Sequence, residues 1–226
     1  MYKYETHLHT APVSRCACVG VEETVKFYKD AGYDGVFITN HFIGGNINLE
    51  DDKVYEDALN YYFSDYDKGV EIGKKLGIKV FLGIETTYGG TDFLVYGLEK
   101  EWYFKHPETM KMNMRDMLEF MMENGALVVQ AHPFREAGYI DHIRLFPRSI
   151  QGVEIINACR TDFENEMAKL YAQKYGLLQL AGSDNHVGSR IKILAGMCSD
   201  EPINDEKDFI DYVKSGKMKV FSLPNE

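Results

Sequence analysis

The chain lacks the features that would place it in a membrane or in an oxidising compartment. No apolar run approaches the roughly 18 residues of a membrane-spanning helix, and the first residues lack the basic and apolar regions of a secretory signal. The four cysteines form no C-x-x-C pair, which favours reduced thiols over a disulfide framework. We therefore expect a cytoplasmic protein with no membrane partner.

Positive charge is also scarce, because 25 lysines and arginines stand against 35 acidic residues and give a net charge of -10. Binding to nucleic-acid backbones requires clustered positive charge, so nucleic acid is expected only as a small nucleotide or an oligonucleotide end. No G-x-G-x-x-G motif follows the first predicted strand, and there is no P-loop and no G-x-S-x-G motif. The sequence thus disfavours a Rossmann dinucleotide site and a serine nucleophile in a G-x-S-x-G turn.

Predicted strands and helices alternate along the 226 residues, of which 45% are hydrophobic. Strands are expected at residues 4–10, 36–39, 78–84, 91–98, 126–130, 152–156, 177–181 and 218–221, and helices at 21–31, 55–76, 112–124 and 205–215. No linker-like segment divides the chain, so one domain over residues 1–226 is expected. The alternation predicts a parallel sheet with its chemistry at the carboxyl edge.

Five of the seven histidines fall at or just beyond the end of a predicted strand, namely His7, His9, His41, His132 and His186. His7 and His9 are separated by one residue, so an extended backbone points both imidazoles to the same face. Imidazole is the commonest protein ligand for transition metals, and a metal site is therefore expected. A barrel is preferred over an open doubly wound sheet because only a closed ring lets so many strand ends converge.

The motifs that carry these histidines follow one another in a characteristic order. They are H-x-H (His7, His9), T-x-H (His41), G-x-E (Glu85), H-P-F (His132) and G-S-D-x-H (Asp184, His186). The ordered set resembles the PHP family, named for polymerase and histidinol phosphatase domains, over roughly residues 2–200. The resemblance implies a distorted (β/α)7 TIM-like barrel, two or three divalent zinc, manganese or iron ions, and hydrolysis of phosphate esters. It further implies metal ligation by all seven of these residues and catalytic roles for Glu85, Asp184 and His186.

The chemistry of this residue set agrees with that implication. Imidazoles together with carboxylates suit zinc, manganese or iron, and a carboxylate such as Glu85 can bridge two cations. Two cations about 3.5 to 4 Å apart can activate a water and stabilise the leaving oxygen of an in-line phosphoryl displacement. We therefore expect a metal-dependent phosphoesterase in which a metal-bound hydroxide attacks a small phosphate ester.

Four arginines lie within a few residues of a strand end on the proposed active face, namely Arg15, Arg135, Arg160 and Arg190. The planar guanidinium group pairs bidentately with phosphate oxygens, so these residues are candidates for substrate binding. A solvated loop position is the alternative at each of them.

Two positions depart from the pattern of the family. Asn40 stands before His41, where the family usually has Asp. The family also commonly carries an Asp, Glu or His shortly after H-x-H, and this position falls near Cys16 when counted back from His41 or at Ser14 or Arg15 when counted forward.

The loop after H-x-H decides how a third cation would be held. In the fuller sites of the family, His41, His186 and an anionic residue of this loop hold that ion. Cys16, pointing inward, would supply a thiolate that favours zinc over manganese, because a coordinating metal deprotonates the thiol. Arg15 at the same place would instead repel a cation and attract phosphate.

Two other functions compete with the phosphoesterase. An amidohydrolase-type hydrolase of C–N bonds also uses H-x-H on its first strand, but that superfamily tends to be longer. A degenerate PHP domain could bind metal as a scaffold or sensor without activity, against which the near-complete ligand set argues. Sugar phosphates, histidinol phosphate, nucleotides and oligonucleotide ends all stay open as substrates.

Overall fold

The computed structural model describes residues 1–50 and 53–225, in which nine strands form one sheet of order β7-β6-β5-β4-β3-β2-β1-β8-β9. The strands are β1 (Tyr2–Leu8), β2 (Gly35–Ile38), β3 (Lys79–Tyr88), β4 (Thr91–Tyr96), β5 (Leu127–Gln130), β6 (Gly152–Asn157), β7 (Leu178–Gly182), β8 (Ile193–Ser199) and β9 (Lys219–Pro224). The helices are α1 (Val21–Asp30), α2 (Tyr55–Leu76), α3 (Lys100–Lys105), α4 (Met114–Glu123), α5 (Asp162–Tyr175) and α6 (Glu206–Lys214), with short 3-10 helices η1 (Pro107–Lys111) and η2 (Gly188–Arg190).

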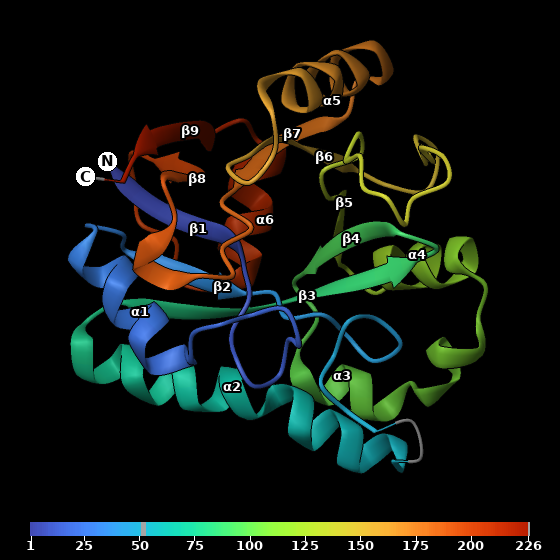
Figure 1. The fold of residues 1–226 in the computed structure, drawn as a ribbon, viewed down its shortest axis with the longest axis horizontal. Helices are drawn as coiled ribbons and strands as arrows, with labels where there is room; N and C mark the ends of the chain where they lie inside the picture. Colours follow the sequence, from blue (N-terminus) through green and yellow to red (C-terminus); the bar gives the residue numbers. More distant parts are fainter. Residues whose placement is uncertain (51–52, 226) are drawn as a thin grey trace.

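The sheet curls until the end of β7 meets β1, which confirms the expected distorted barrel (Figure 1). Leu8 pairs in parallel with Asn185, which follows β7. The hydroxyl of Thr6 in β1 donates to the carbonyl of Ala181 in β7 at 2.6 Å. β1 therefore touches β2, β8 and β7, and the ring is nearly closed.

The expectation of a parallel sheet is wrong in part, because β4 runs antiparallel to both β3 and β5, and β8 runs antiparallel to β1 and β9. The β3–β4 connection is the two-residue turn Gly89-Gly90, in which both residues have positive φ (54° and 82°). Such a turn builds a hairpin, whereas a parallel crossover needs a dozen or more residues. In the described residues, the helices that connect neighbouring parallel strands are α1 between β1 and β2, α2 between β2 and β3, and α5 between β6 and β7. The chain thus departs from seven regular strand–helix units.

The amino end of the barrel is plugged by α6. Phe209 of α6 packs on Phe37 of β2 at a ring-centroid distance of 4.5 Å and on Tyr96 of β4 at 5.2 Å. All three side chains belong to one buried apolar cluster that also includes Tyr4 and Phe81. Burying aromatic rings here closes one end of the barrel and leaves the carboxyl ends of its parallel strands, such as β1, β2 and β3, at the other.

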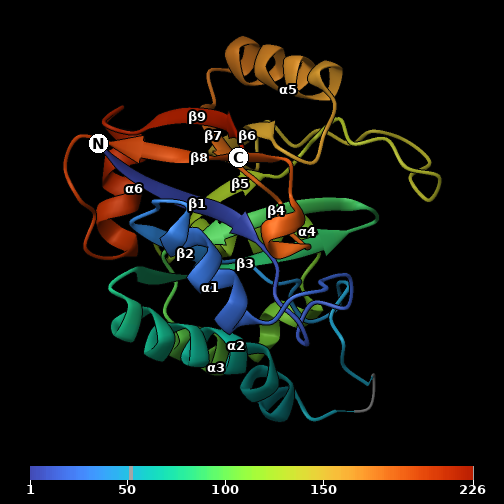
Figure 2. The same ribbon diagram turned by 60° about the vertical axis from the view of Figure 1, so that its left-hand side comes forward.

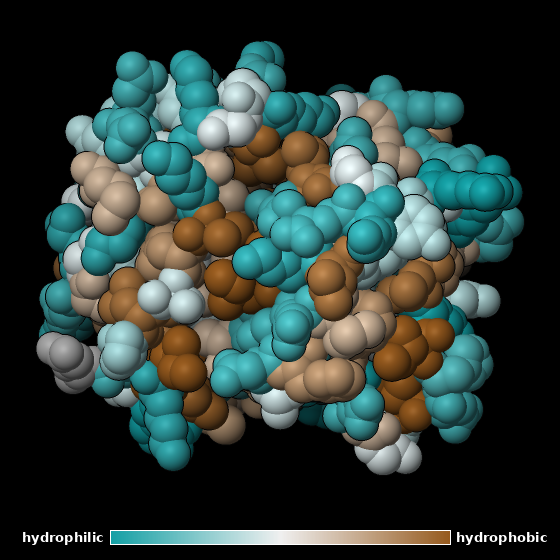
Figure 3. All heavy atoms as spheres, turned by 90° about the horizontal axis from the view of Figure 1, so that it is seen from above, coloured by the Kyte–Doolittle hydropathy of each residue, from teal (hydrophilic) through white to brown (hydrophobic). Residues whose placement is uncertain are grey.

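The remaining helices and one long loop surround the barrel. Figure 1 shows α1 and α2 on one side and α5 on the opposite side. Figure 2 shows the connection of residues 131–151 projecting beside the β3–β4 hairpin, to which it is tied by the guanidinium of Arg144 on the carbonyl of Gly89. The face that carries α5 mixes apolar patches with hydrophilic side chains (Figure 3). Across the part of the chain that the structure describes, no helix has the length and apolar character that crossing a membrane requires.

The seam between β7 and β1 leaves no room for a side chain at Gly182. A Cβ atom at this position would meet the Cβ atom of His7 and lie 3.0 Å from the backbone nitrogen of His7. Gly182→Ala is expected to lower the free energy of unfolding by about 1 to 3 kcal/mol through overpacking. The control is Gly138→Ala, because nothing lies within 4 Å of a Cβ atom there. Denaturant titration measures both variants, and equal midpoints would contradict this account of the seam.

Candidate metal centre

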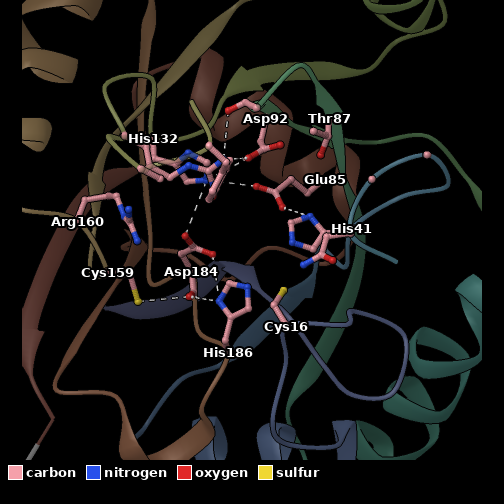
Figure 4. Close-up of a pocket in the computed structure, with 17 residues that line it drawn as sticks. Cys16, His41, Glu85, Thr87, Asp92, His132, Cys159, Arg160, Asp184 and His186 are labelled. Atoms are coloured by element: carbon pink, nitrogen blue, oxygen red, sulfur yellow. Dashed lines mark hydrogen bonds and ion pairs between the residues drawn. The ribbon is translucent and has the colours of Figure 1, made fainter. Parts of the chain in front are cut away.

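The structure brings together all seven residues that the motifs indicated as ligands. Figure 4 labels five of them, namely His41, Glu85, His132, Asp184 and His186. His7 and His9 lie at the end of β1, His41 follows β2, Glu85 lies in β3, His132 follows β5, and Asp184 and His186 follow β7. His132 and Asp184 are the described non-glycine residues with positive φ, at 26° and 54°. Strained backbone of this kind persists where the surrounding structure holds it in place, and it is frequent at functional sites.

Glu85 lies at the centre of the cluster and is 1% exposed. Its Oε1 is 3.2 Å from His7 Nε2 and 3.4 Å from His132 Nε2. Its Oε2 is 2.7 Å from His41 Nδ1 and 3.4 Å from His9 Nε2. The carboxylate is therefore surrounded by four imidazole rings.

Neither oxygen of Glu85 has a hydrogen-bond partner, and neither has Nδ1 of His41. His41 and Glu85 thus form an ion pair at 2.7 Å, but the geometry of this contact is not that of a hydrogen bond. A buried charge without hydrogen bonds is costly, whereas a cation coordinated by the same atoms would satisfy them. The residues present therefore fit the metal ions that the resemblance implies.

Three overlapping groups of side chains each bring three ligand atoms within 4.8 Å of one another. They are His7 with Glu85 and His132, His7 with His9 and Asp184, and His9 with His41 and His186. Neutral imidazole and carboxylate donors in such groups suit divalent zinc, manganese or iron. The arrangement has donors enough for two cations and for a third beside them.

Electrostatics within the cluster prepare three of these groups for a cation, namely Glu85, Asp184 and His9. Burial disfavours the carboxylate form of Glu85, but the charges of His41 and His7 outweigh burial and hold the pKa of Glu85 well below its usual value. Burial likewise opposes ionisation of Asp184, and His7 together with His9 holds its pKa well below the usual value. Burial and two neighbouring histidines keep the pKa of His9 well below 6.5. Burial lowers the pKa of His41, but Glu85 outweighs this effect and raises it to about 11, so His41 must release a proton to bind metal.

Glu154 of β6 supports the cluster from behind, and the sequence interpretation missed it. Its Oε1 lies 2.8 Å from Nδ1 of His7. Its Oε2 accepts from the backbone nitrogen of His132 at 3.0 Å and from the side-chain amide of Asn157 at 2.9 Å. A carboxylate on Nδ1 leaves Nε2 of His7 for a metal. The signal was readable, since Glu154 is an acidic residue inside an otherwise apolar predicted strand.

In the loop after H-x-H, Cys16 is the residue that lines the cavity beside His41 and His186 (Figure 4). Burial raises the pKa of the Cys16 thiol, but hydrogen bonds with His186 and His41 outweigh burial and lower it to about 6. Ser14 is buried and lies 3.1 Å from Nδ1 of His9 through its hydroxyl, whereas Arg15 is exposed. Of the three alternatives, Cys16 is therefore the residue that shares the cavity with His41 and His186.

The four predicted phosphate-binding arginines separate into two pairs. Arg135 and Arg160 line the cavity of about 740 Å³ into which the cluster opens. Arg15 and Arg190 are exposed and lie outside its lining. Asp92 in β4, which the sequence interpretation did not single out, is 2% exposed and holds Arg135 at 2.8 Å.

Replacing any of His7, His9, Glu85 or His132 with alanine is expected to remove at least one metal equivalent per chain, because each would be a direct ligand. His106→Ala is the control, since His106 lies outside the cluster and its ring is 2.8 Å from Glu108. Elemental analysis of the purified proteins gives the result. Metal contents equal to the parent in all four variants would show that the cluster holds no metal.

Cys16→Ala is expected to lower the retention of a third cation while two tightly held ions stay in place. The matched control is Cys159→Ala, because Cys159 lines the same cavity but donates to the carbonyl of Asp184 at 3.4 Å. Loading with zinc and with manganese before elemental analysis tests the thiolate's preference for zinc. Three full equivalents in parent and Cys16→Ala alike would rule out a thiolate ligand.

Comparisons with known proteins add to this geometry. A model of the PHP-associated region matches residues 162–218, from α5 to the end of the α6–β9 connection. No protein of curated function matches the chain in sequence.

Several solved structures share the fold over nearly the whole chain. A two-domain protein from Bacteroides vulgatus, which contains a PHP-like metal-dependent phosphoesterase by prediction, has a TM-score of 0.71 at 16% identity over 97% of this chain. This chain spans 64% of that protein, less than two thirds of its length. A presumed metal-dependent phosphoesterase from Bifidobacterium adolescentis has a TM-score of 0.57 at 13% identity, over 93% of this chain and 95% of its own.

An amidohydrolase from Chromobacterium violaceum, with bound sulfate and no metal, has a TM-score of 0.60 at 12% identity, over 96% of this chain and 97% of its own. At these identities the likeness concerns the fold. The match to the PHP-associated region over residues 162–218, together with the barrel shared with PHP-like structures, supports the resemblance that the motifs indicated.

Proposed function

We propose that the chain is a metal-dependent phosphoesterase that hydrolyses a small phosphate ester. The observation that carries the proposal is the juxtaposition of three overlapping ligand groups with Arg135 and Arg160 on the wall of one cavity. The ligand groups fit divalent cations, and the guanidinium groups fit phosphate oxygens.

The side chains divide between the cations as follows. Two ions would be held mainly by His7, His9, Glu85, His132 and Asp184, and a third by His41 and His186 with Cys16 beside them. When bound, such cations activate a water molecule and offset the charge that develops on the phosphate oxygens. Glu85 contacts His7 and His132 through one oxygen and His9 and His41 through the other, so its carboxylate would supply oxygen ligands at the centre of the cluster.

Arg135 and Arg160 would bind the phosphate group of the substrate. The Nε atoms of both are buried and have no hydrogen-bond partner, which leaves these N–H groups free to donate. Asp92 and the carbonyl of Gly90 hold Arg135 at 2.8 and 3.2 Å and so limit its rotation toward solvent. A guanidinium group fixed in this way binds phosphate at less conformational cost.

Asp184 is the residue placed to move a proton. Its Oδ1 lies 3.4 Å from both His7 Nε2 and His9 Nε2, and its low pKa keeps it ionised at neutral pH. Oδ1 faces the two histidines and would hold a cation with them, so Oδ2 is the atom that would accept a proton from the attacking water. His186, whose side chain is 25% exposed, lies at the solvent side of the cluster, where the leaving group would depart.

The size of the cavity favours a small substrate. A volume of about 740 Å³ is that of a small-molecule site. The net charge of -10 disfavours a long nucleic-acid backbone beside it.

A C–N hydrolase is the second candidate, because the Chromobacterium structure that shares the fold is an amidohydrolase. The two arginines favour the phosphoesterase, since an uncharged amide offers them no anionic group. Both reactions would use the same ligand cluster, so the substrate itself has to separate them.

Hydrolysis of an aryl phosphate is expected to disappear on chelation and to return with manganese or zinc, because a bound cation lowers the pKa of water enough to form hydroxide near neutral pH. The measurement is turnover of a panel that contains a phosphomonoester, a phosphodiester and an amide, with and without metal. Undiminished phosphate release by a verified metal-free preparation would contradict the proposal of a metal-dependent phosphoesterase. Turnover of the amide alone would support the C–N hydrolase, and metal binding without any turnover would support a scaffold or sensor.

A further inference from the structure

Glu5 of β1 is a buried carboxylate that lies next to the metal centre but outside it. It is 0% exposed, it does not line the cavity, and none of the three ligand groups contains it. Its Oε2 has no hydrogen-bond partner. Burying a carboxylate in this way is costly, so the contacts of its other oxygen have to offset the cost.

The other oxygen of Glu5 holds two segments that are far apart in the chain. Oε1 accepts from the backbone nitrogen of His7 at 2.8 Å and from the backbone nitrogen of Ser183 at 2.9 Å. His7 is an expected ligand at the end of β1, and Ser183 directly precedes the expected ligand Asp184 after β7. One atom therefore holds the backbone of both segments, and hydrogen bonds to a charged acceptor are the stronger ones.

The bond to His7 lies where the pairing of β1 is irregular. From Glu5 to Leu8, β1 advances by three positions while the paired strand β2 advances by two. Thr6 and His7 lie within this bulge. A bulge interrupts the regular backbone pairing and redirects a side chain. The carboxylate of Glu5 bonds the backbone nitrogen of His7 at this point and so helps to set the direction of its ring.

The bond to Ser183 lies where β7 ends. The next residue, Asp184, has a positive φ of 54°, a strained conformation that its surroundings must hold in place. The seam is tight here, since a Cβ atom at Gly182 would lie 3.0 Å from the backbone nitrogen of His7. A displacement of either segment would therefore move His7 Nε2 relative to Asp184 Oδ1, which are 3.4 Å apart.

We propose that Glu5 is a positioning residue that fixes the directions of His7 and Asp184 through the backbones of their two segments. The inference rests on the metal site of the proposed function and holds for any reaction performed there. Without an acceptor oxygen at this place, the N–H groups of His7 and Ser183 would be left unsatisfied in a buried seam. The segments would shift to satisfy them, and the ligand atoms of His7 and Asp184 would lose their common geometry.

Glu5→Met and Glu5→Gln form the test pair. Glutamine keeps an acceptor oxygen at the same reach, and its amide nitrogen takes the place of the unpaired Oε2. Methionine fills a similar space and offers only a weakly accepting sulfur. Zinc affinity, measured by competition with a chromophoric chelator, should fall by about 10-fold to 100-fold in Glu5→Met and stay near the parent value in Glu5→Gln.

Thr6→Val is the control that separates positioning from stability. The hydroxyl of Thr6 donates to the carbonyl of Ala181 at 2.6 Å across the same seam, but it bonds neither His7 nor Ser183. Like Glu5→Met, this variant should unfold at a lower denaturant concentration than the parent. Unlike Glu5→Met, it should bind zinc with the parent affinity.

A measurement on the parent covers the case in which Glu5→Met does not fold. The N–H groups of His7 and Ser183 should exchange with deuterated solvent as slowly as those that pair β1 with β8, in the parent and in Glu5→Gln alike. Exchange at the rate of exposed loop amides would show that Glu5 holds neither segment.

Three further results would overturn the inference. They are the parent zinc affinity in Glu5→Met, an equal loss in Glu5→Gln, which would assign the effect to charge, and an equal loss in Thr6→Val, which would assign it to stability. Zinc affinity is measured without substrate. A parent that binds zinc but hydrolyses no phosphate ester would therefore contradict the proposed function and leave the role of Glu5 intact.

Discussion

The candidate site depends on the parallel contact between β1 and the segment that follows β7. In this contact Leu8 lies opposite Asn185, and the backbone of Asn185 bonds to His7 and His9 at 3.3 and 2.9 Å. Leu8 packs in an apolar cluster with α1, and the Asn185 side chain donates to the hydroxyl of Tyr28 in α1. Because neighbours along an extended chain point to opposite faces, His7 and His9, which flank Leu8, both turn toward Glu85. Asp184 and His186, which flank Asn185, lie beside them in the cluster. One backbone pairing thus sets four of the seven nominated ligands.

Much of this arrangement was readable from the sequence because its signals are local. The helix expected at 55–76 is observed with those bounds and ends at Gly77, whose φ of 69° suits glycine. Histidines and carboxylates at strand ends indicated one converging site, since the ends of parallel strands meet at one edge. The antiparallel course of β4 was also available in principle from the Gly89-Gly90 turn, which the alternation of strands and helices concealed.

Other features depend on neighbours that are distant in the chain. The α5 helix begins with a capping box of Thr161 and Glu164, but exposed apolar residues such as Phe163 and Leu170 blur its periodicity. The β8 strand is identified by its antiparallel pairing with β1, almost two hundred residues earlier. The partners of Asp92 and Glu154 likewise come from other strands and loops, and no sequence spacing encodes these contacts.

The unpaired oxygens of Glu85 affect the stability of the folded protein as well as its chemistry. A buried carboxylate without hydrogen bonds raises the free energy of the metal-free fold, and cations that bind only the folded chain lower it. A free cation at a hundred times its dissociation constant would add about 2.7 kcal/mol of stability. Changes of that size alter how often a protein unfolds and is degraded in a cell. The supply of metal would therefore set how much of this protein persists, in addition to how fast each molecule works.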